Sequence, residues 1–261
     1  MSPLLLQNIV KSTCFDSGHS FNRELRINEL CNFVNLRSKV QYNDIQNISG
    51  RGKTKGLINR KYSSESIMEE SRYQIIKITT SYYELLVAMI HNLSKRDYSE
   101  ETQRELLGRF HHDIAEQETV HKCRNTIAIG DFNVNPFEIA CISAGSMHAI
   151  PYREEASVRP ERIVAGKSRL KFYNPTWKFF GNSTIPYTTY YKDKSGDAMN
   201  YYWNAFDQVM IRPELIEAFD ESQLRIIGTT KNHVLLKNGK PYRTNYSDHL
   251  PLFCVLREEL I

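Results

Sequence analysis

Apolar and polar positions along the chain predict a small set of strands and helices. Residues 73–80, YQIIKITT, and 84–91, ELLVAMIH, have branched and aliphatic side chains at their centres, with a turn around Ser81 between them. This pattern predicts two adjoining strands. Residues 126–130, TIAIG, form a short apolar run that is typical of a strand buried on both faces.

A helix is predicted between the second and third of these strands. Ser99 is a favourable N-cap residue, and Leu106, Phe110 and Ile114 recur at four-residue steps on the way to His121. The order strand, helix, strand indicates an α/β protein.

Further elements are predicted on both sides of this central region. Apolar residues at helical spacing mark two N-terminal stretches, Leu4 to Val10 and Leu25 to Val34, and a shorter one at 137–145, FEIACISAG. Two more apolar runs predict strands in the second half of the chain: AFDQVMI at 205–211 and LPLFCVL at 250–256.

Residues 41–70 are polar and rich in glycine and serine, which predicts a mobile surface loop. The middle of this segment is basic and contains Arg51, Lys53, Lys55, Arg60 and Lys61. These cations suit a patch that faces phosphate, although a solvated surface loop is the simpler interpretation.

Composition narrows the class of protein. The chain has 261 residues, of which 41% are hydrophobic and 25% charged, as expected for a globular protein. A single domain over residues 1–261 is predicted, since sandwiches and barrels of this size are commonly one domain. The formal net charge of +4 permits a phosphate-bearing partner without demonstrating one.

Cysteines and hydropathy indicate the compartment. The five cysteines are scattered, contain no C-x-x-C pair and form no evident disulfide framework, which favours a reducing environment. The sequence contains no apolar run of membrane-spanning length, and its N-terminus lacks the features of a signal peptide. A cytoplasmic location is therefore predicted.

The first chemical motif follows the predicted strand 126–130. Asp131 and Asn133 stand two residues apart, and Gly130 and Pro136 favour turns of the backbone on either side. Their side chains can therefore lie on the same side, which would bring an acid and an amide donor together. A plain turn, in which both side chains bond their own backbone, accounts for the same residues.

The second chemical motif, SDHLP, places Asp248 and His249 directly before the strand predicted at 250–256. Successive side chains of an extended chain point to opposite faces, so Asp248 is badly placed to bond its neighbour. Asp207, at the start of another predicted strand, is the candidate carboxylate for orienting His249. Taken alone, a histidine such as His249 is more often a capping or surface residue than a catalytic one.

Four segments in this order, IHNLSK, GDFNVNPFE, WNAFDQVMI and SDHLP, resemble the motifs of the endonuclease/exonuclease/phosphatase superfamily. This superfamily includes deoxyribonucleases, abasic-site endonucleases, sphingomyelinases and inositol-phosphate phosphatases. The resemblance covers residues 70–261 and is most specific at GDFN and SDH. It implies an α/β fold in which two mostly antiparallel sheets form a sandwich flanked by helices, with the active site at one edge.

The resemblance also implies a role for each polar residue of these motifs. His249 matches the histidine at the scissile phosphate, and Asp207 matches the acid that orients this histidine and favours its charged form. Asp131 would orient the attacking water or protonate the leaving oxygen. Asn133 would donate a hydrogen bond to the phosphate in the transition state.

A metal ion is a further implication of the resemblance. Asp248 matches a magnesium ligand, with Mg²⁺ or Mn²⁺ as the cofactor, because hard cations prefer carboxylate oxygens. His91 matches a second histidine of the deoxyribonuclease-like and sphingomyelinase-like members. The implied reaction is metal-assisted, in-line attack of water on a phosphate ester.

The N-terminal part departs from the family pattern. Family members begin with a strand that ends in Trp-Asn and a second strand that ends in Gln-Glu, and this glutamate is the principal metal ligand. Neither pair occurs in the N-terminal part of this chain. Residues 3–8, PLLLQN, resemble the second motif with Asn8 in place of the acid. We favour a different alignment, in which Leu4 to Val10 belong to the helix after the missing glutamate and the first strands are absent.

Three functions therefore remain open. The first is a metal-dependent phosphodiesterase, most simply a nuclease. The second is a non-catalytic member that binds phosphates or a protein partner, and the third is an enzyme of small or lipid phosphate esters. Residues 172–182 and 187–204 combine aromatic side chains with lysines, a mixture that stacks bases and favours nucleic acid as the partner. The same aromatic residues would also serve to cover the edge of the sandwich.

Overall fold

The computed structural model describes residues 4–7, 27–49, 52–80, 82–181, 187–193, 196 and 198–261. Its main element is a seven-stranded sheet with the strand order β4-β5-β6-β7-β14-β11-β8. The strands are β4 (Ser63–Glu69), β5 (Tyr73–Thr79), β6 (Glu84–His91), β7 (Thr126–Asp131), β14 (Asp207–Ile211), β11 (Phe172–Tyr173) and β8 (Ala149–Ile150). Neighbouring strands are antiparallel except for the pairs β6–β7 and β11–β8.

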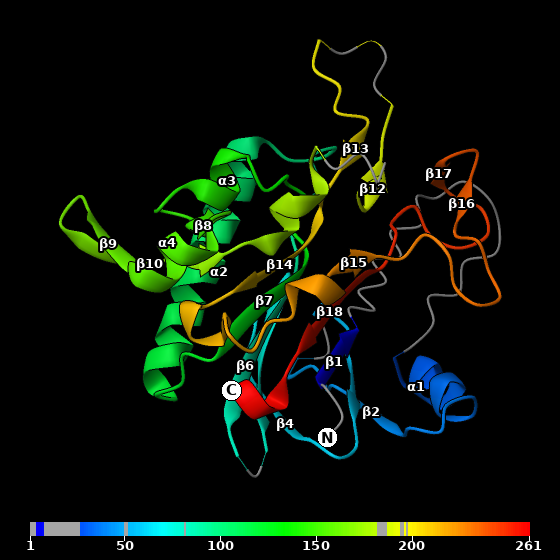
Figure 1. Cartoon of the computed structure of the whole chain (residues 1–261), viewed down its shortest axis with the longest axis horizontal. Coiled ribbons are helices and arrows are strands. Elements are labelled where there is room, and N and C mark those ends of the chain that lie inside the picture. Colours follow the sequence, from blue (N-terminus) through cyan, green and yellow to red (C-terminus); the bar gives the residue numbers. More distant parts are fainter. Residues whose placement is uncertain are drawn as a thin grey trace.

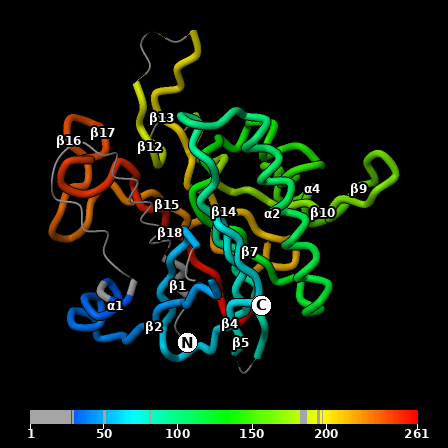
Figure 2. The backbone as a smooth tube through the Cα atoms, turned by 180° about the vertical axis from the view of Figure 1, so that it is seen from behind, coloured from blue at the N-terminus to red at the C-terminus, as the bar shows by residue number. Residues whose placement is uncertain are grey.

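A smaller antiparallel sheet has the order β1-β18-β15 and consists of β1 (Leu4–Gln7), β18 (Leu252–Leu256) and β15 (Arg225–Ile226). The described residues also form four two-stranded sheets: β2 (Tyr42–Asp44) with β3 (Leu57–Asn59), β9 (Glu161–Val164) with β10 (Lys167–Leu170), β12 (Tyr190–Tyr191) with β13 (Trp203–Asn204), and β16 (Leu236–Lys237) with β17 (Lys240–Pro241). The hairpins β9–β10 and β12–β13 extend outward in both views (Figures 1 and 2).

The α-helices are α1 (Ile27–Asn35), α2 (Glu100–Val120), α3 (Ile139–Ile142) and α4 (Arg153–Val158). In the part of the chain that the structure describes, four short 3₁₀ helices lie at Pro175–Phe179, Pro213–Leu215, Glu221–Gln223 and Glu258–Leu260. Helices α2, α3 and α4 lie on one side of the large sheet, and the small sheet lies on the other (Figure 1).

Alternation of side chains along the central strands produces this layered arrangement. Along β7, Ile127 and Ile129 face the small sheet and share a buried core with Leu252 of β18. Ala128, between them, belongs to a second core that includes Phe110 of α2. The fold class expected from the sequence, an α/β sandwich with flanking helices, is thereby confirmed.

Most of the predicted elements are present. The two adjoining strands correspond to β5 and β6, and the buried run 126–130 corresponds to β7. Helix α2 begins after Ser99, whose side chain accepts a hydrogen bond from the backbone N–H of Thr102, and it ends at His121. Strands β14 and β18 occupy the two predicted positions in the second half, whereas the helix expected at 137–145 is reduced to the single turn α3.

One expectation for the N-terminal part is wrong. Leu4–Gln7 form strand β1 instead of a helix, because they pair with β18 in a register that places Gln7 opposite Phe253. The segment 41–70, expected to contain a loop, also contains β2, β3 and β4, and residues 45–49 and 52–56 lie between β2 and β3 outside any strand. Strand β4 is polar because it lies at the edge of the large sheet, where one side remains accessible to water.

A buried ion pair ties α2 to the large sheet. Arg212, which follows β14 and is 1% exposed, donates two hydrogen bonds to the carboxylate of Glu118, at 2.8 and 3.1 Å. It donates a third to the carbonyl oxygen of Lys171, and its guanidinium lies over the ring of Phe172. No helix in the described part of the chain is both long enough and apolar enough to cross a membrane.

Candidate active site

Three of the candidate residues form one row across adjacent strands. His91 is paired with Asp131, and Asp131 is paired with Asp207, at the ends of β6 and β7 and the start of β14. Each stands two residues from a side chain of the core between the sheets: Met89, Ile129 and Val209 respectively. The row therefore faces the small sheet. Its members are 8%, 2% and 5% exposed, so the strand ends bury two acids and a histidine together.

The backbones of β7 and β6 approach closely just before Asp131, which keeps His91 and Asp131 side by side. Gly130 has a φ of 144°, and a Cβ at this position would overlap the carbonyl oxygen of Ile90. Glycine is therefore required immediately before Asp131.

His249 reaches the site from the side of the small sheet. It precedes β18, and its Nδ1 lies 2.6 Å from Oδ2 of Asp207, the contact expected from the sequence. Thr189 holds the two segments together, because its hydroxyl accepts a hydrogen bond from the backbone N–H of Asp207 and its carbonyl accepts one from Leu250. The carboxylate thus holds the imidazole in one orientation and leaves Nε2 for a substrate.

Asp131 and Asn133 lie together, and they also form the plain turn considered above. The backbone N–H of Asn133 donates to Oδ1 of Asp131 at 2.8 Å, and its side-chain amide donates to Oδ2 at 3.1 Å. The amide also donates to the carbonyl oxygen of Asn92 at 3.1 Å. Asn133 has a φ of 52°, a left-handed conformation that asparagine tolerates. Its direct effect is to fix the carboxylate of Asp131.

Charges in the site favour the imidazolium form of His249. Burial by itself lowers the pKa of His249, but the carboxylates of Asp207, Asp131 and Asp248 outweigh burial and hold the pKa well above its ordinary value. His249 therefore presents a positive charge at neutral pH.

Asp131 and His91 are shifted toward their neutral forms. Burial raises the pKa of Asp131, and the negative charge of Asp207 adds to the rise, although the imidazolium of His249 opposes it. Burial and the positive charges of Arg72, His249 and Lys53 lower the pKa of His91 to about 4. A carboxyl group with a raised pKa is suited to proton transfer at neutral pH, and His91, whose Nε2 lies 3.9 Å from Oδ2 of Asp131, is neutral there.

Replacing Asp207 with asparagine is expected to move the pKa of His249 down toward the ordinary histidine value of about 6.5. The amide retains the shape of the carboxylate but carries no negative charge. The lowering of the His249 pKa by burial is therefore offset less strongly. Titration of the His249 imidazole by NMR measures this shift. Asp97→Asn, at an exposed position, serves as the control, and identical titrations in the two variants would contradict the electrostatic role of Asp207.

The donor set for a metal is small. Asp131 is bonded to Asn133 and Asp207 to His249, whereas Asp248 has no hydrogen bond or ion pair within the described residues. Mg²⁺ commonly binds through one or two carboxylates together with phosphates of the substrate. Asp248 therefore fits a weak magnesium site that the substrate completes.

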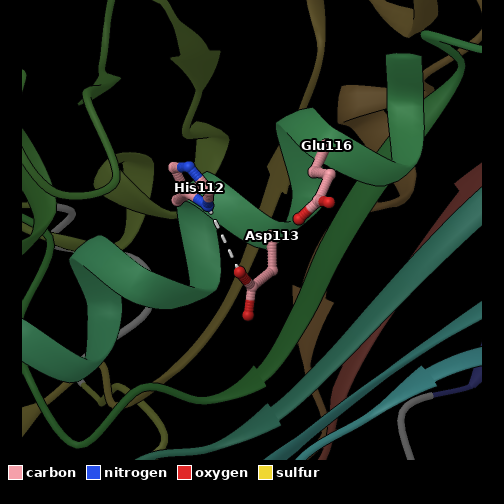
Figure 3. Close-up of side chains that lie close together, drawn as sticks. All are labelled: His112, Asp113 and Glu116. Atoms are coloured by element: carbon pink, nitrogen blue, oxygen red, sulfur yellow. Dashed lines mark hydrogen bonds and ion pairs between the residues drawn. The ribbon is translucent and has the colours of Figure 1, made fainter. Parts of the chain in front are cut away.

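A different group of possible metal ligands lies on α2. Within the described ranges, His112, Asp113 and Glu116 are the group of three such residues whose ligand atoms lie within 4.8 Å of one another. Figure 3 shows His112 and Asp113 joined by a hydrogen bond. Asp113 also accepts a hydrogen bond from the hydroxyl of Tyr73, which lies on the helix-facing side of the sheet. The group is therefore separate from the candidate active site.

Sequence reasoning missed two residues of the site. Asn92 is fully buried, and its amide donates to the carbonyl oxygen of Phe132, which binds β6 to the loop after Asp131. Tyr190 bridges to His249, and the two ring centroids are 4.8 Å apart. Asn92 stands within the motif IHNLSK, which provided a signal, whereas nothing in the local sequence distinguishes Tyr190 from its aromatic neighbours.

Comparison with known proteins gives similar folds at low identity. No protein-family model and no curated protein sequence matches the chain. The endonuclease domain of TRAS1, a telomere-specific non-LTR retrotransposon, is 11% identical with a TM-score of 0.49, over 90% of this chain and 94% of that domain. A D. rerio TDP2 humanized by 14 mutations is 19% identical with a TM-score of 0.47, over 87% and 80% of the two chains.

The human Nocturnin catalytic domain with bound sulfate is 15% identical with a TM-score of 0.44, over 88% of this chain and 77% of that domain. The likeness to all three is one of fold.

Proposed function

We propose that the chain is a nuclease-type hydrolase that cleaves phosphodiester bonds in nucleic acid. The observation that carries the proposal is the buried contact between His249 and Asp207 beside Asp131. A cation, an acid with a raised pKa and a fixed geometry in one place are what in-line attack on a phosphate needs.

Each residue contributes a separate function in this reaction. His249 holds its positive charge against the scissile phosphate and stabilises the charge that develops there. Asp131 orients the attacking water or gives a proton to the leaving oxygen. Asn133 fixes Asp131, and its donation to the phosphate requires release of one of its present acceptors. His91, in its neutral form, is available as a hydrogen-bond partner beside Asp131.

A divalent ion, Mg²⁺ or Mn²⁺, completes the proposal with Asp248 as its ligand. When bound, such an ion neutralises phosphate charge and lowers the pKa of water.

Nucleic acid is the proposed partner because a group of aromatic side chains adjoins the site. Phe137 lies at the centre of this group, with ring centroids 5.2 Å from Tyr201, 5.3 Å from Phe180 and 6.3 Å from Trp177. Tyr201 is 52% exposed. We call these four residues the aromatic plate. Bases stack on such side chains without regard to sequence.

The aromatic plate is attached to the catalytic segments. Asn135, two residues before Phe137, donates to the side chain of Asn204 at 2.9 Å and accepts from the backbone N–H of Ala205. Asp207 follows directly on the same segment. A strand stacked on the plate would therefore lead toward the row of His91, Asp131 and Asp207.

Trp177→Ala is expected to weaken binding of single-stranded DNA by roughly tenfold, the loss of one stacked base. The melting temperature should fall by a smaller proportion, because the ring is only half-buried. Fluorescence anisotropy with a labelled oligonucleotide measures the affinity, and Tyr152→Ala, which removes an exposed ring outside the plate, is the control. If the variant lost stability as much as it lost affinity for DNA, the aromatic plate would instead serve to cover the edge of the sandwich.

We also propose that residues 1–261 act as one domain in the cytoplasm. The core between the sheets, which joins residues as distant as Ile45 and Leu256, supports a single domain. Cys31, Cys123 and Cys141 are free thiols, which supports a reducing compartment.

A substrate panel tests the proposed function. Supercoiled plasmid, single-stranded DNA, a lipid phosphodiester and an inositol phosphate are incubated with the chain and Mg²⁺, and His249→Ala reports any contaminating activity. Cleavage of DNA by the unaltered chain alone is the expected result. Turnover of only the small or lipid esters would favour that alternative, and no turnover by a folded chain would favour a non-catalytic binding protein.

A further inference from the structure

Arg72 extends the row of candidate residues by one strand. Tyr73 is paired with Ile90, and the backbone N–H of His91 donates to the carbonyl oxygen of Arg72 at 2.8 Å, so Arg72 stands opposite His91. Tyr73 packs in the core on the helix-facing side of the sheet. Because side chains alternate along a strand, the side chain of Arg72 leaves the backbone on the opposite face of the sheet, the face of His91 and Asp131.

The positive charge of Arg72 has no counterion in the described part of the chain. Its side chain is half-exposed, and no hydrogen bond or ion pair to a described residue engages it. Lys53 lies beside it, since its backbone N–H donates to the carbonyl oxygen of Ser71 at 3.3 Å, and its exposed ammonium is similarly unpaired. One end of the row thus has two unpaired cations.

Both cations act on the site electrostatically. After burial, the charge of Arg72 is the largest influence that lowers the pKa of His91, and Lys53 contributes to the same shift. Two other basic residues of this segment differ, because Arg60 donates to Asn43 and Lys61 is paired with Glu258.

The spacing of the sheet separates these cations from the cleavage position. Neighbouring strands lie about 4.8 Å apart, so Arg72 starts about 10 Å from Asp131, two strands away. His249 and Asp131 already serve the phosphate that is cleaved. The guanidinium is better placed for a second anionic group of the same substrate, which it can bind through two parallel hydrogen bonds.

We propose that Arg72, assisted by Lys53, holds a second phosphate of the substrate, next along the strand from the phosphate that is cleaved. This inference rests on the proposed function and narrows it. A nucleic acid strand offers neighbouring phosphates, whereas a lipid phosphodiester with one phosphate does not. The site would therefore select substrates that have two phosphates.

Three dinucleotide substrates isolate the second phosphate. TpT has only the bond to be cleaved, whereas pTpT and TpTp add a terminal phosphate on either side. The value of kcat/KM is measured for each with the unaltered chain, Arg72→Met, Arg72→Lys and Lys53→Met. Arg109→Met, on the exposed surface of α2, is the matched control.

The unaltered chain is expected to prefer pTpT or TpTp over TpT by roughly tenfold or more, the contribution of a charged hydrogen bond. Arg72→Met should abolish this preference, and Arg72→Lys should retain part of it. An unchanged preference in Arg72→Met, or none in the unaltered chain, would overturn the inference.

Cleavage of none of the three dinucleotides, together with no turnover in the substrate panel, would refute the proposed function instead. Titration calorimetry with the same dinucleotides then decides the inference separately. Tighter binding of pTpT or TpTp than of TpT, lost in Arg72→Met, would support the second phosphate site. Equal affinities would reject it.

Discussion

Replacing His249 with alanine is expected to lower kcat for phosphodiester cleavage by about 10²–10³-fold, the range that one positioned group stabilising transition-state charge contributes. The change removes the cation that we propose faces the scissile phosphate. It also leaves the buried carboxylate of Asp207 without its partner. Initial rates at saturating single-stranded DNA, measured from pH 5 to pH 9, give the size of the loss.

Two comparisons show whether the loss of rate is specific to His249. His112→Ala removes an exposed histidine of α2 and should leave the rate unaltered. His249→Ala should show a loss at every pH in the range, because Asp207 and its acidic neighbours keep His249 protonated through neutral pH. A rate within threefold of that of the unaltered chain would exclude His249 from the chemistry.

Replacing Glu118 with alanine is expected to lower the free energy of unfolding by about 3–5 kcal/mol, the usual cost of removing one partner of a buried ion pair. Arg212 would remain buried with a charge and only the carbonyl oxygen of Lys171 to accept from it. Denaturation in urea, followed by circular dichroism, measures the change. The site should keep its geometry below the transition, since Glu118 lies on the helix side of the sheet.

An exposed pair and a double variant serve as controls. Glu105→Ala breaks the exposed pair with Arg109 and should cost no more than about 1 kcal/mol. The double variant Glu118→Leu/Arg212→Met removes both charges and should be more stable than Glu118→Ala alone. A loss below about 1 kcal/mol for Glu118→Ala would contradict a structural role of the pair.

The pattern of apolar and polar residues predicted the elements that pack against segments close to them in the sequence. Strands β5 and β6 follow one another across a short turn, and the Ser99 cap marks the start of α2. Leu4–Gln7 could not be assigned in this way, because a short apolar run is compatible with a helix or a strand. Pairing with β18, at the other end of the chain, decides the matter.

The part of the candidate site that follows from the alternation of side chains along a strand could be predicted from the sequence. Adjacent side chains on an extended chain cannot meet, so the carboxylate for His249 had to come from elsewhere, and Asp207 is in contact with it. Arg72 was not predictable, because an arginine before a strand is ordinary. Only the register with His91 brings it to the site.

The most direct test of the account is cleavage of 5′-labelled single-stranded DNA by Asp131→Asn in the presence of Mg²⁺. The substitution changes one oxygen of the carboxylate to an amide nitrogen. The remaining oxygen can still accept from the backbone N–H of Asn133, whereas the bond from the Asn133 side-chain amide is lost together with the proton-transfer group. The account predicts cleavage by the unaltered chain and a loss of at least about a hundredfold in the variant. Equal rates for the two proteins, with the fold intact in both, would contradict it.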